Sequence, residues 1–184
     1  LRGGMETYRL VPHQAHPPLA ITSIEARVIG PDMNWLRLRW RIEGTGRLVV
    51  PKFAGKGRAD GLWQTTCFEV FLQPEGGQPY CEFNLSPSER WNAYDFHSRR
   101  EGMAERPVQR EPVCTMRMGS SFAIFDAAIP GAALPEAHCA MGLTSVIEEE
   151  GGHKSYWALA HHETKPDFHD PACFTARLAP PSAT

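Results

Sequence analysis

WLRLRWRIE, residues 35–43, alternates apolar and polar side chains from Leu36 to Glu43. In an extended chain Leu36, Leu38, Trp40 and Ile42 share one face, and the three arginines share the other. This period of two predicts a strand of an antiparallel sheet, with one face in the core and the other in water. Residues 21–29 precede it across a Gly-Pro-Asp turn, so we expect the two segments to pair as a hairpin.

Short segments of the same kind recur along the chain, separated by many of its 16 glycines and 16 prolines. We expect further strands at residues 47–50, 66–72, 80–85, 91–96, 113–118, 122–129, 139–147, 155–161 and 174–178. Gly-Gly turns at 75–78 and 150–153 are typical of hairpins. Helical turns are expected only at 102–106 and 134–138, because no pattern of period 3.6 extends over a dozen residues.

The pattern predicts an all-β protein, an antiparallel β-sandwich of the jelly-roll or immunoglobulin-like kind. A closed barrel with an internal cavity is the alternative. The length of 184 residues suits a single domain, which we expect to span residues 5–178. Residues 1–4 precede Met5 and are expected to be an expression remnant, and residues 179–184 are expected to be a disordered tail.

Composition argues against several classes of partner. The net charge is -2 and basic residues are scattered, so neither nucleic acid nor an anionic membrane is expected as a partner. No segment has the apolar length of a membrane span, and no secretory signal is visible. The five cysteines are odd in number and lack a CxxC spacing. We therefore expect free, buried thiols, a cytoplasmic location, and neither zinc nor any other cofactor.

The two strands that flank the first Gly-Gly turn carry an acidic pair. Glu69 shares its strand face with Cys67 and Phe71, and Glu82 shares its face with Tyr80 and Asn84. Pairing of these strands can set Glu69 beside Glu82. Because like charges opposite each other destabilise a sheet, a ligand, a cation, an arginine or a shifted pKa must offset the repulsion.

Aromatic residues accompany this pair in the sequence: Trp63, Trp91 and Tyr94. An aromatic face stacks on the C–H face of a pyranose, and carboxylate and amide oxygens accept hydrogen bonds from its hydroxyl groups. The combination predicts a sugar-binding surface. The alternative is that the tryptophans belong to the core or its rim and that the two glutamates face water.

Residues 165–169, Lys-Pro-Asp-Phe-His, form a second polar cluster. Asp167 and His169 alternate, so both could point to the rim of the same ligand site. Alternatively, they cap neighbouring backbone groups in a loop. No HxxxH pair or facial-triad spacing indicates a metal site here.

Several segments, taken together, resemble a DOMON-like domain, a group related to the family-9 carbohydrate-binding modules. The resemblance rests on Leu62–Trp63, Cys67–Leu72, Glu82–Asn84, Ser86–Pro87, Trp91, Ala93–Asp95, Tyr156–His161 and Lys165–His169. It covers the chain from about residue 21 to residue 178. It implies a β-sandwich that binds a sugar or haem without catalysing a reaction. In family-9 modules the sugar lies between two tryptophan rings, and the candidates by motif position are Trp63 and Trp91.

A non-catalytic module that binds a small ligand, most simply a saccharide, is therefore the expected function. Two alternatives stay open at this point. The first is a glycoside-acting enzyme that uses Glu69 and Glu82, for which the spacing of the two carboxyl groups would be decisive. The second is a haem-binding domain, which would need axial histidine or methionine ligands.

Overall fold

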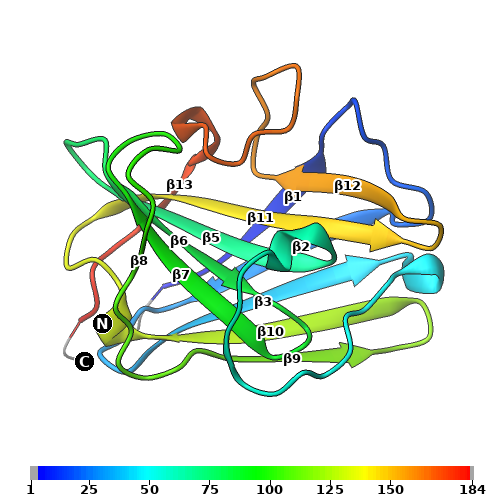
Figure 1. Ribbon diagram of the computed structural model, residues 1–184, viewed down its shortest axis with the longest axis horizontal. Helices are drawn as coiled ribbons and strands as arrows, with labels where there is room; N and C mark the ends of the chain where they lie inside the picture. The colour runs from blue at the N-terminus through cyan, green and yellow to red at the C-terminus, as the bar shows by residue number, and fades with distance from the viewer. Residues whose placement is uncertain (1–3, 183–184) are drawn as a thin grey trace.

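The computed structural model describes residues 4–182 and consists almost entirely of strands and loops (Figure 1). The strands are β1 Met5–Pro12, β2 Ser23–Ile29, β3 Trp35–Glu43, β4 Gly57–Arg58, β5 Cys67–Pro74, β6 Tyr80–Leu85, β7 Arg90–Phe96, β8 Ala104–Glu105, β9 Val113–Met118, β10 Phe122–Pro130, β11 Cys139–Glu149, β12 His153–Ala158 and β13 Ala176–Leu178. Four single-turn 3₁₀ helices accompany them: η1 Thr45–Arg47, η2 Leu62–Gln64, η3 Gly131–Ala133 and η4 Pro171–Cys173. The predicted all-β class is confirmed.

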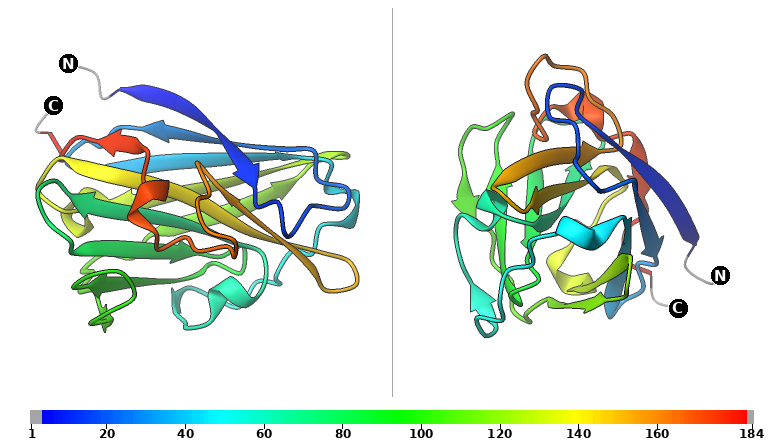
Figure 2. Two further views of the ribbon diagram at one scale, coloured as in Figure 1. Left: turned by 90° about the horizontal axis from the view of Figure 1, so that it is seen from above. Right: turned by 90° about the vertical axis from the view of Figure 1, so that its right-hand side faces the viewer.

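All the strands belong to one curled, mixed sheet with the order β4-β7-β6-β5-β11-β12-β1-β2-β3-β10-β9. β8 pairs with β7 and β13 pairs with β11 beside this path. β4 and β7 run parallel, whereas the other paired strands are antiparallel. Strand β1 joins two halves of the sheet, β4-β7-β6-β5-β11-β12 on one side and β2-β3-β10-β9 on the other. Its first six residues pair with β2, and its last two pair with β12. The end-on view shows the two halves curled around a common interior (Figure 2).

The interior between the halves is a packed apolar core. Trp40 of β3 lies 5.3 Å from Phe68 of β5 and 5.9 Å from Phe125 of β10, measured between ring centroids. The rings of Phe68 and Phe125 stack at 4.1 Å. The core therefore fills the space that the barrel alternative would have left for a ligand. Within residues 4–182, β4 and β9 end the sheet without pairing to each other, so the sheet is not closed.

The strand predictions hold where the alternation is strong. The predicted hairpin forms between β2 and β3, with Ala26 opposite Trp40, and both Gly-Gly turns join adjacent antiparallel strands. β1 was not predicted, because only Leu10 in it is buried and its apolar residues do not alternate. The predicted strand at 47–50 is wrong: η1 occupies its start, and Leu48 forms only an isolated bridge to Glu149.

The two predicted helical turns are also wrong. Residues 102–106 contain β8, and the 3₁₀ turn near 134–138 lies earlier, at Gly131–Ala133. All five cysteines are free and buried, as predicted. No helix within residues 4–182 is long and apolar enough to cross a membrane. Ser182 of the predicted disordered tail forms a bridge with Asp32, whereas residues 1–3 and 183–184 lie outside the described part of the chain.

Candidate functional site

The candidate site lies on the face of β11, β5, β6 and β7 that points away from the core. Cross-strand pairing places Thr144, Glu69, Asn84 and Asn92 in one row. The next row contains Gly142, Phe71, Glu82 and Tyr94. A face turned away from a core is normally solvated, but Glu69, Glu82, Asn84 and Asn92 are each at most 5% exposed. Surrounding loops therefore cover this polar surface.

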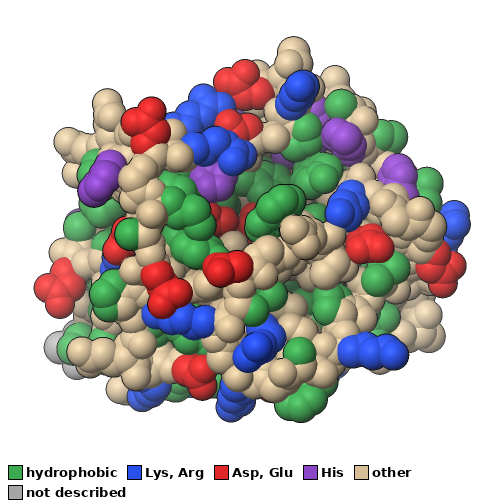
Figure 3. All heavy atoms as spheres, viewed as in Figure 1, with side chains coloured by type: hydrophobic (Ala, Val, Ile, Leu, Met, Phe, Trp, Pro, Cys, Tyr) green, Lys and Arg blue, Asp and Glu red, His purple; other side chains and the backbone are tan. Residues whose placement is uncertain are grey.

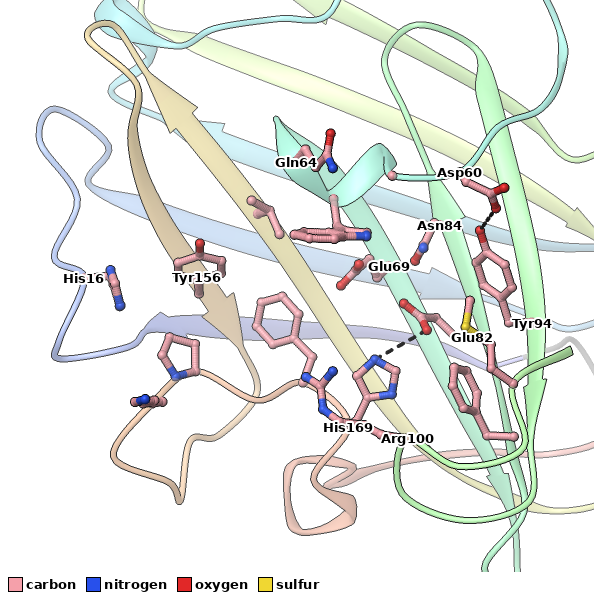
Figure 4. A pocket seen from close by; sticks show the side chains of 18 residues that line it. His16, Asp60, Gln64, Glu69, Glu82, Asn84, Tyr94, Arg100, Tyr156 and His169 are labelled. Atoms are coloured by element: carbon pink, nitrogen blue, oxygen red, sulfur yellow. Dashed lines mark hydrogen bonds and ion pairs between the residues drawn. The ribbon is translucent and has the colours of Figure 1, made fainter. Parts of the chain in front are cut away.

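The covering loops leave a cavity of about 1140 Å³ above the two rows. In the space-filling view this side is hollowed, with hydrophobic side chains around acidic and histidine side chains (Figure 3). Six of the nine predicted site residues line the cavity: Trp63, Glu69, Glu82, Asn84, Tyr94 and His169. The close-up shows His16 and Tyr156 at one end, Asp60 and Tyr94 at the other, and the acidic pair between them (Figure 4).

The two glutamates share this face, as predicted, but the register differs from the prediction. Glu69 stands opposite Asn84, and Glu82 stands opposite Phe71, so the carboxyl groups are diagonal neighbours. With its amide nitrogen turned towards the acids, Asn84 donates to Glu82 Oε1 at 2.8 Å and to Glu69 Oε1 at 3.2 Å. Thr144 Oγ1 donates to Glu69 Oε2 at 2.9 Å. Hydrogen bonds from neutral side chains thus hold the acidic pair together.

Burial decides the protonation of the pair. Removal from water raises the pKa of Glu69 to about 7, against smaller lowering effects of the Thr144 hydrogen bond and the Arg100 charge. Burial, reinforced by repulsion from Glu69, raises the pKa of Glu82 well above its ordinary value. Near neutral pH, with no cation between them, the two carboxyl groups therefore retain at least one proton.

His169 faces the pair from the loop after β12. Tyr80 Oη accepts a hydrogen bond from the Arg100 backbone N–H, and it lies 2.7 Å from His169 Nδ1. Donation of the tyrosine proton to Nδ1 leaves the imidazole hydrogen on Nε2, 3.6 Å from Glu82 Oε2. Burial and the Arg100 charge lower the pKa of His169 to about 4, so the ring is neutral at physiological pH. Tyr80 thus positions His169 from behind the cavity wall.

Asp167 also lies behind the wall. It accepts hydrogen bonds from Arg99 Nε at 3.0 Å and from Arg100 Nη2 at 2.9 Å. Burial alone would raise the pKa of Asp167, but these two guanidinium groups lower it below its usual value. The Asp167 side chain therefore ties the 165–169 loop to the loop after β7. Asp167 is not among the residues that line the cavity, and its contacts hold the cavity wall.

Trp63 and Trp91 are not brought together. Trp63 stands on η2, lines the cavity and is 55% exposed. Trp91 is 2% exposed on the core face of β7, and its Nε1 donates to Glu111. The sheet lies between Trp91 and the cavity, so the prediction of a ligand-binding Trp91 is wrong and a sandwich of these two rings is impossible.

Other aromatic and polar residues complete the cavity. Tyr156, Phe168 and Phe96 supply further rings, and Gln64, Met103, Lys165 and His16 contribute to the rim. Asp60, just before η2, accepts hydrogen bonds from Tyr94 Oη and from Asn92 Nδ2. Sequence reasoning missed Asp60, His16 and Arg100 because they lie in loops, where no periodicity reveals the direction of a side chain. Within residues 4–182 no three His, Cys, Asp or Glu side chains form a group able to hold a metal ion.

Comparison by sequence finds no matching family and no matching curated protein. Comparison by structure finds a candidate carbohydrate-binding protein from Bacteroides uniformis, with a TM-score of 0.63 and 19% identity, which covers 93% of this chain and 84% of that one. It also finds a family 9 carbohydrate-binding module from Caldicellulosiruptor kristjanssonii, solved with cellotriose, with a TM-score of 0.64 and 8% identity over 98% of this chain and 84% of that one. The chain therefore shares the fold of these proteins.

Proposed function

We propose that the chain is a non-catalytic module that binds a saccharide in the cavity above β5, β6 and β7. One observation carries the proposal: the half-exposed Trp63 ring borders a row of buried carboxyl and amide groups on the face opposite the core. A pyranose has the matching chemistry, an apolar C–H face for stacking and hydroxyl groups for the polar row. The fold shared with a module solved with cellotriose supports the same ligand class.

The relationship to DOMON-like domains and a jelly-roll type of sandwich are parts of the same proposal, as is a single domain spanning residues 5–178. A cytoplasmic location is also proposed, because five buried free thiols suit a reducing compartment. No reaction is assigned to Glu69 and Glu82, since the Asn84 amide engages both of them.

Calorimetric titration with a panel of oligosaccharides tests the proposal. We expect Trp63→Ala to weaken the best ligand at least about tenfold, because truncation of an aromatic residue that anchors a ligand typically costs ~2 kcal/mol or more. Phe53→Ala is the matched control, since Phe53 is 70% exposed and lies outside the cavity lining. The proposal fails if no saccharide binds, or if both variants bind as well as the parent protein.

A further inference from the structure

One oxygen of the acidic pair has no hydrogen-bond partner within residues 4–182. Glu82 is 5% exposed and lines the cavity, and its Oε1 is engaged by Asn84. The nearest basic group to its Oε2 is His169 Nε2 at 3.6 Å, which is beyond hydrogen-bond distance. Figure 4 shows the Glu82 carboxyl directed towards His169 and the open space. Glu82 Oε2 therefore opens into the cavity without a donor from the described residues, and a donor must come from water or from a ligand in the cavity.

In the described part of the chain, no Lys or Arg side chain forms a salt bridge with the carboxyl groups around this oxygen. Both guanidinium groups nearby, Arg99 and Arg100, bind Asp167. Neither Asp60 nor Glu69 forms a salt bridge with any group in the described part of the chain. Three carboxyl groups therefore line the cavity from its middle to its Asp60 end, with only neutral hydrogen-bond donors as partners.

We propose that the saccharide is an amino sugar, whose protonated amine binds Glu82 and Glu69. The inference rests on the proposed saccharide function and specifies its ligand class. An ammonium group has three N–H donors, enough for the free Glu82 oxygen and a neighbouring Glu69 oxygen. A hydroxyl group brings a single donor and no charge, so it cannot take the place of the proton that the acidic pair retains.

The surrounding rings suit the same ligand. Trp63, Tyr94 and Phe96 line this cavity, and an ammonium group is attracted to the face of an aromatic ring. Binding of the amine also changes the number of protons that the acidic pair holds. The free pair retains a proton near neutral pH because of burial, and the arriving ammonium replaces that proton as the compensating positive charge. Amine binding should therefore release up to about one proton per ligand to the solvent.

Three β-1,4-linked tetrasaccharides that differ only at carbon 2 test the inference: the tetramers of glucosamine, N-acetylglucosamine and glucose. We expect the glucosamine tetramer to bind at least about tenfold more tightly than the other two at pH 6, where its amines are protonated. Titrations in buffers of different ionisation enthalpy should show proton release for the glucosamine tetramer alone. Glu82→Gln should reduce the preference to less than about twofold and suppress the proton release, while Glu25→Gln, a surface change on β2, should preserve both.

The outcomes separate the two proposals. Equal or tighter binding of the glucose tetramer overturns the amino-sugar inference and leaves the saccharide function intact. Equal amine preference in Glu82→Gln, with its fold verified by circular dichroism, also overturns the inference, because the preference would then come from general surface charge. If the parent protein binds none of the three, nor any sugar of the wider panel, the proposed function itself fails.

Discussion

At the residue scale, hydrogen bonds from Asn84 allow two glutamate side chains to lie side by side on one buried surface. Its amide is the shared donor for Glu69 and Glu82, and the side chain is 3% exposed. A side chain without N–H donors at this position would leave the carboxyl oxygens unsatisfied. Glu69, Glu82 and Asn84 therefore act as one hydrogen-bonded unit.

Asn84→Asp tests this role. The change removes both amide hydrogens and adds a third carboxyl group, so we expect the free energy of unfolding at pH 7.5 to fall by about 3 kcal/mol. The loss should shrink at pH 5, where the carboxyl groups are protonated. Chemical denaturation at the two pH values measures both effects. Asn34→Asp, at an exposed position, is the control; an equal effect at both sites would refute the assigned role.

Glu149 is a second buried acid, and its role is structural. Its Oε2 accepts from Leu19 N–H at 2.7 Å, and its Oε1 accepts from Ala20 N–H at 2.8 Å and Ile21 N–H at 3.2 Å. A glutamine presents a single oxygen, so in Glu149→Gln at least one backbone N–H would face an NH₂ group. We expect a loss of about 2 kcal/mol in the free energy of unfolding.

The same variant should loosen the loop between β1 and β2, which carries His16 to the rim of the cavity. Hydrogen exchange of the Leu19, Ala20 and Ile21 amides measures this loosening directly. Glu148→Gln is the matched control, because the Glu148 side chain has no hydrogen bond within residues 4–182. Unchanged exchange of the three amides in Glu149→Gln would contradict the prediction.

At the scale of the elements, β11 must pass close beneath an aromatic cluster. Gly142 on β11 stands opposite Phe71, and a Cβ added there would lie 2.7 Å from the Phe174 ring. We expect Gly142→Ala to lower the free energy of unfolding by about 1–3 kcal/mol, because the ring must move in a packed region. Thermal denaturation checks this, with Gly46→Ala as the control, since no atom lies within 4 Å of the Cβ added there. A stability equal to that of the control would show that Phe174 moves freely.

Strand periodicity predicted much of this architecture, including the shared face of Glu69 and Glu82. It could also have placed Trp91 correctly. Trp91 and Tyr94 are three positions apart on β7, so in a regular strand they point to opposite faces. Periodicity could not predict the register of β5 and β6, because the length of the Gly-Gly turn between them allowed several pairings. The Arg99 and Arg100 contacts with Asp167 join loops 67–68 positions apart, and no local pattern encodes them.

At the scale of the whole molecule, the site makes stability depend on pH. The raised pKa values of Glu69 and Glu82 mean that the folded state binds more protons than the unfolded chain above the ordinary carboxyl pKa of 4.5. Their contribution to stability is complete below that pH and is lost as the pH rises through about 7. The lowered pKa of His169, about 4 against 6.5, acts in the opposite sense: its contribution is lost as the pH falls from 6.5 through 4.

Between pH 6.5 and pH 8, the Glu69 and Glu82 carboxyl groups change the free energy of unfolding, whereas His169 is largely neutral in both the folded and the unfolded state. We therefore expect the free energy of unfolding of the parent protein to decrease over this range, and Glu69→Gln to flatten the decrease. Urea denaturation at half-unit intervals of pH measures the slope. A slope that is the same in both proteins would show that Glu69 does not titrate in this window.

The alternation along β5, β6 and β7 has a consequence for how such a protein can diversify. Odd and even positions of the same strands serve two separate purposes, since one set packs in the core and the other faces the cavity. Selection can therefore exchange cavity-facing residues, or the loops around them, while the core-facing set preserves the fold. Such a scaffold can change the chemistry of its cavity while the fold is preserved.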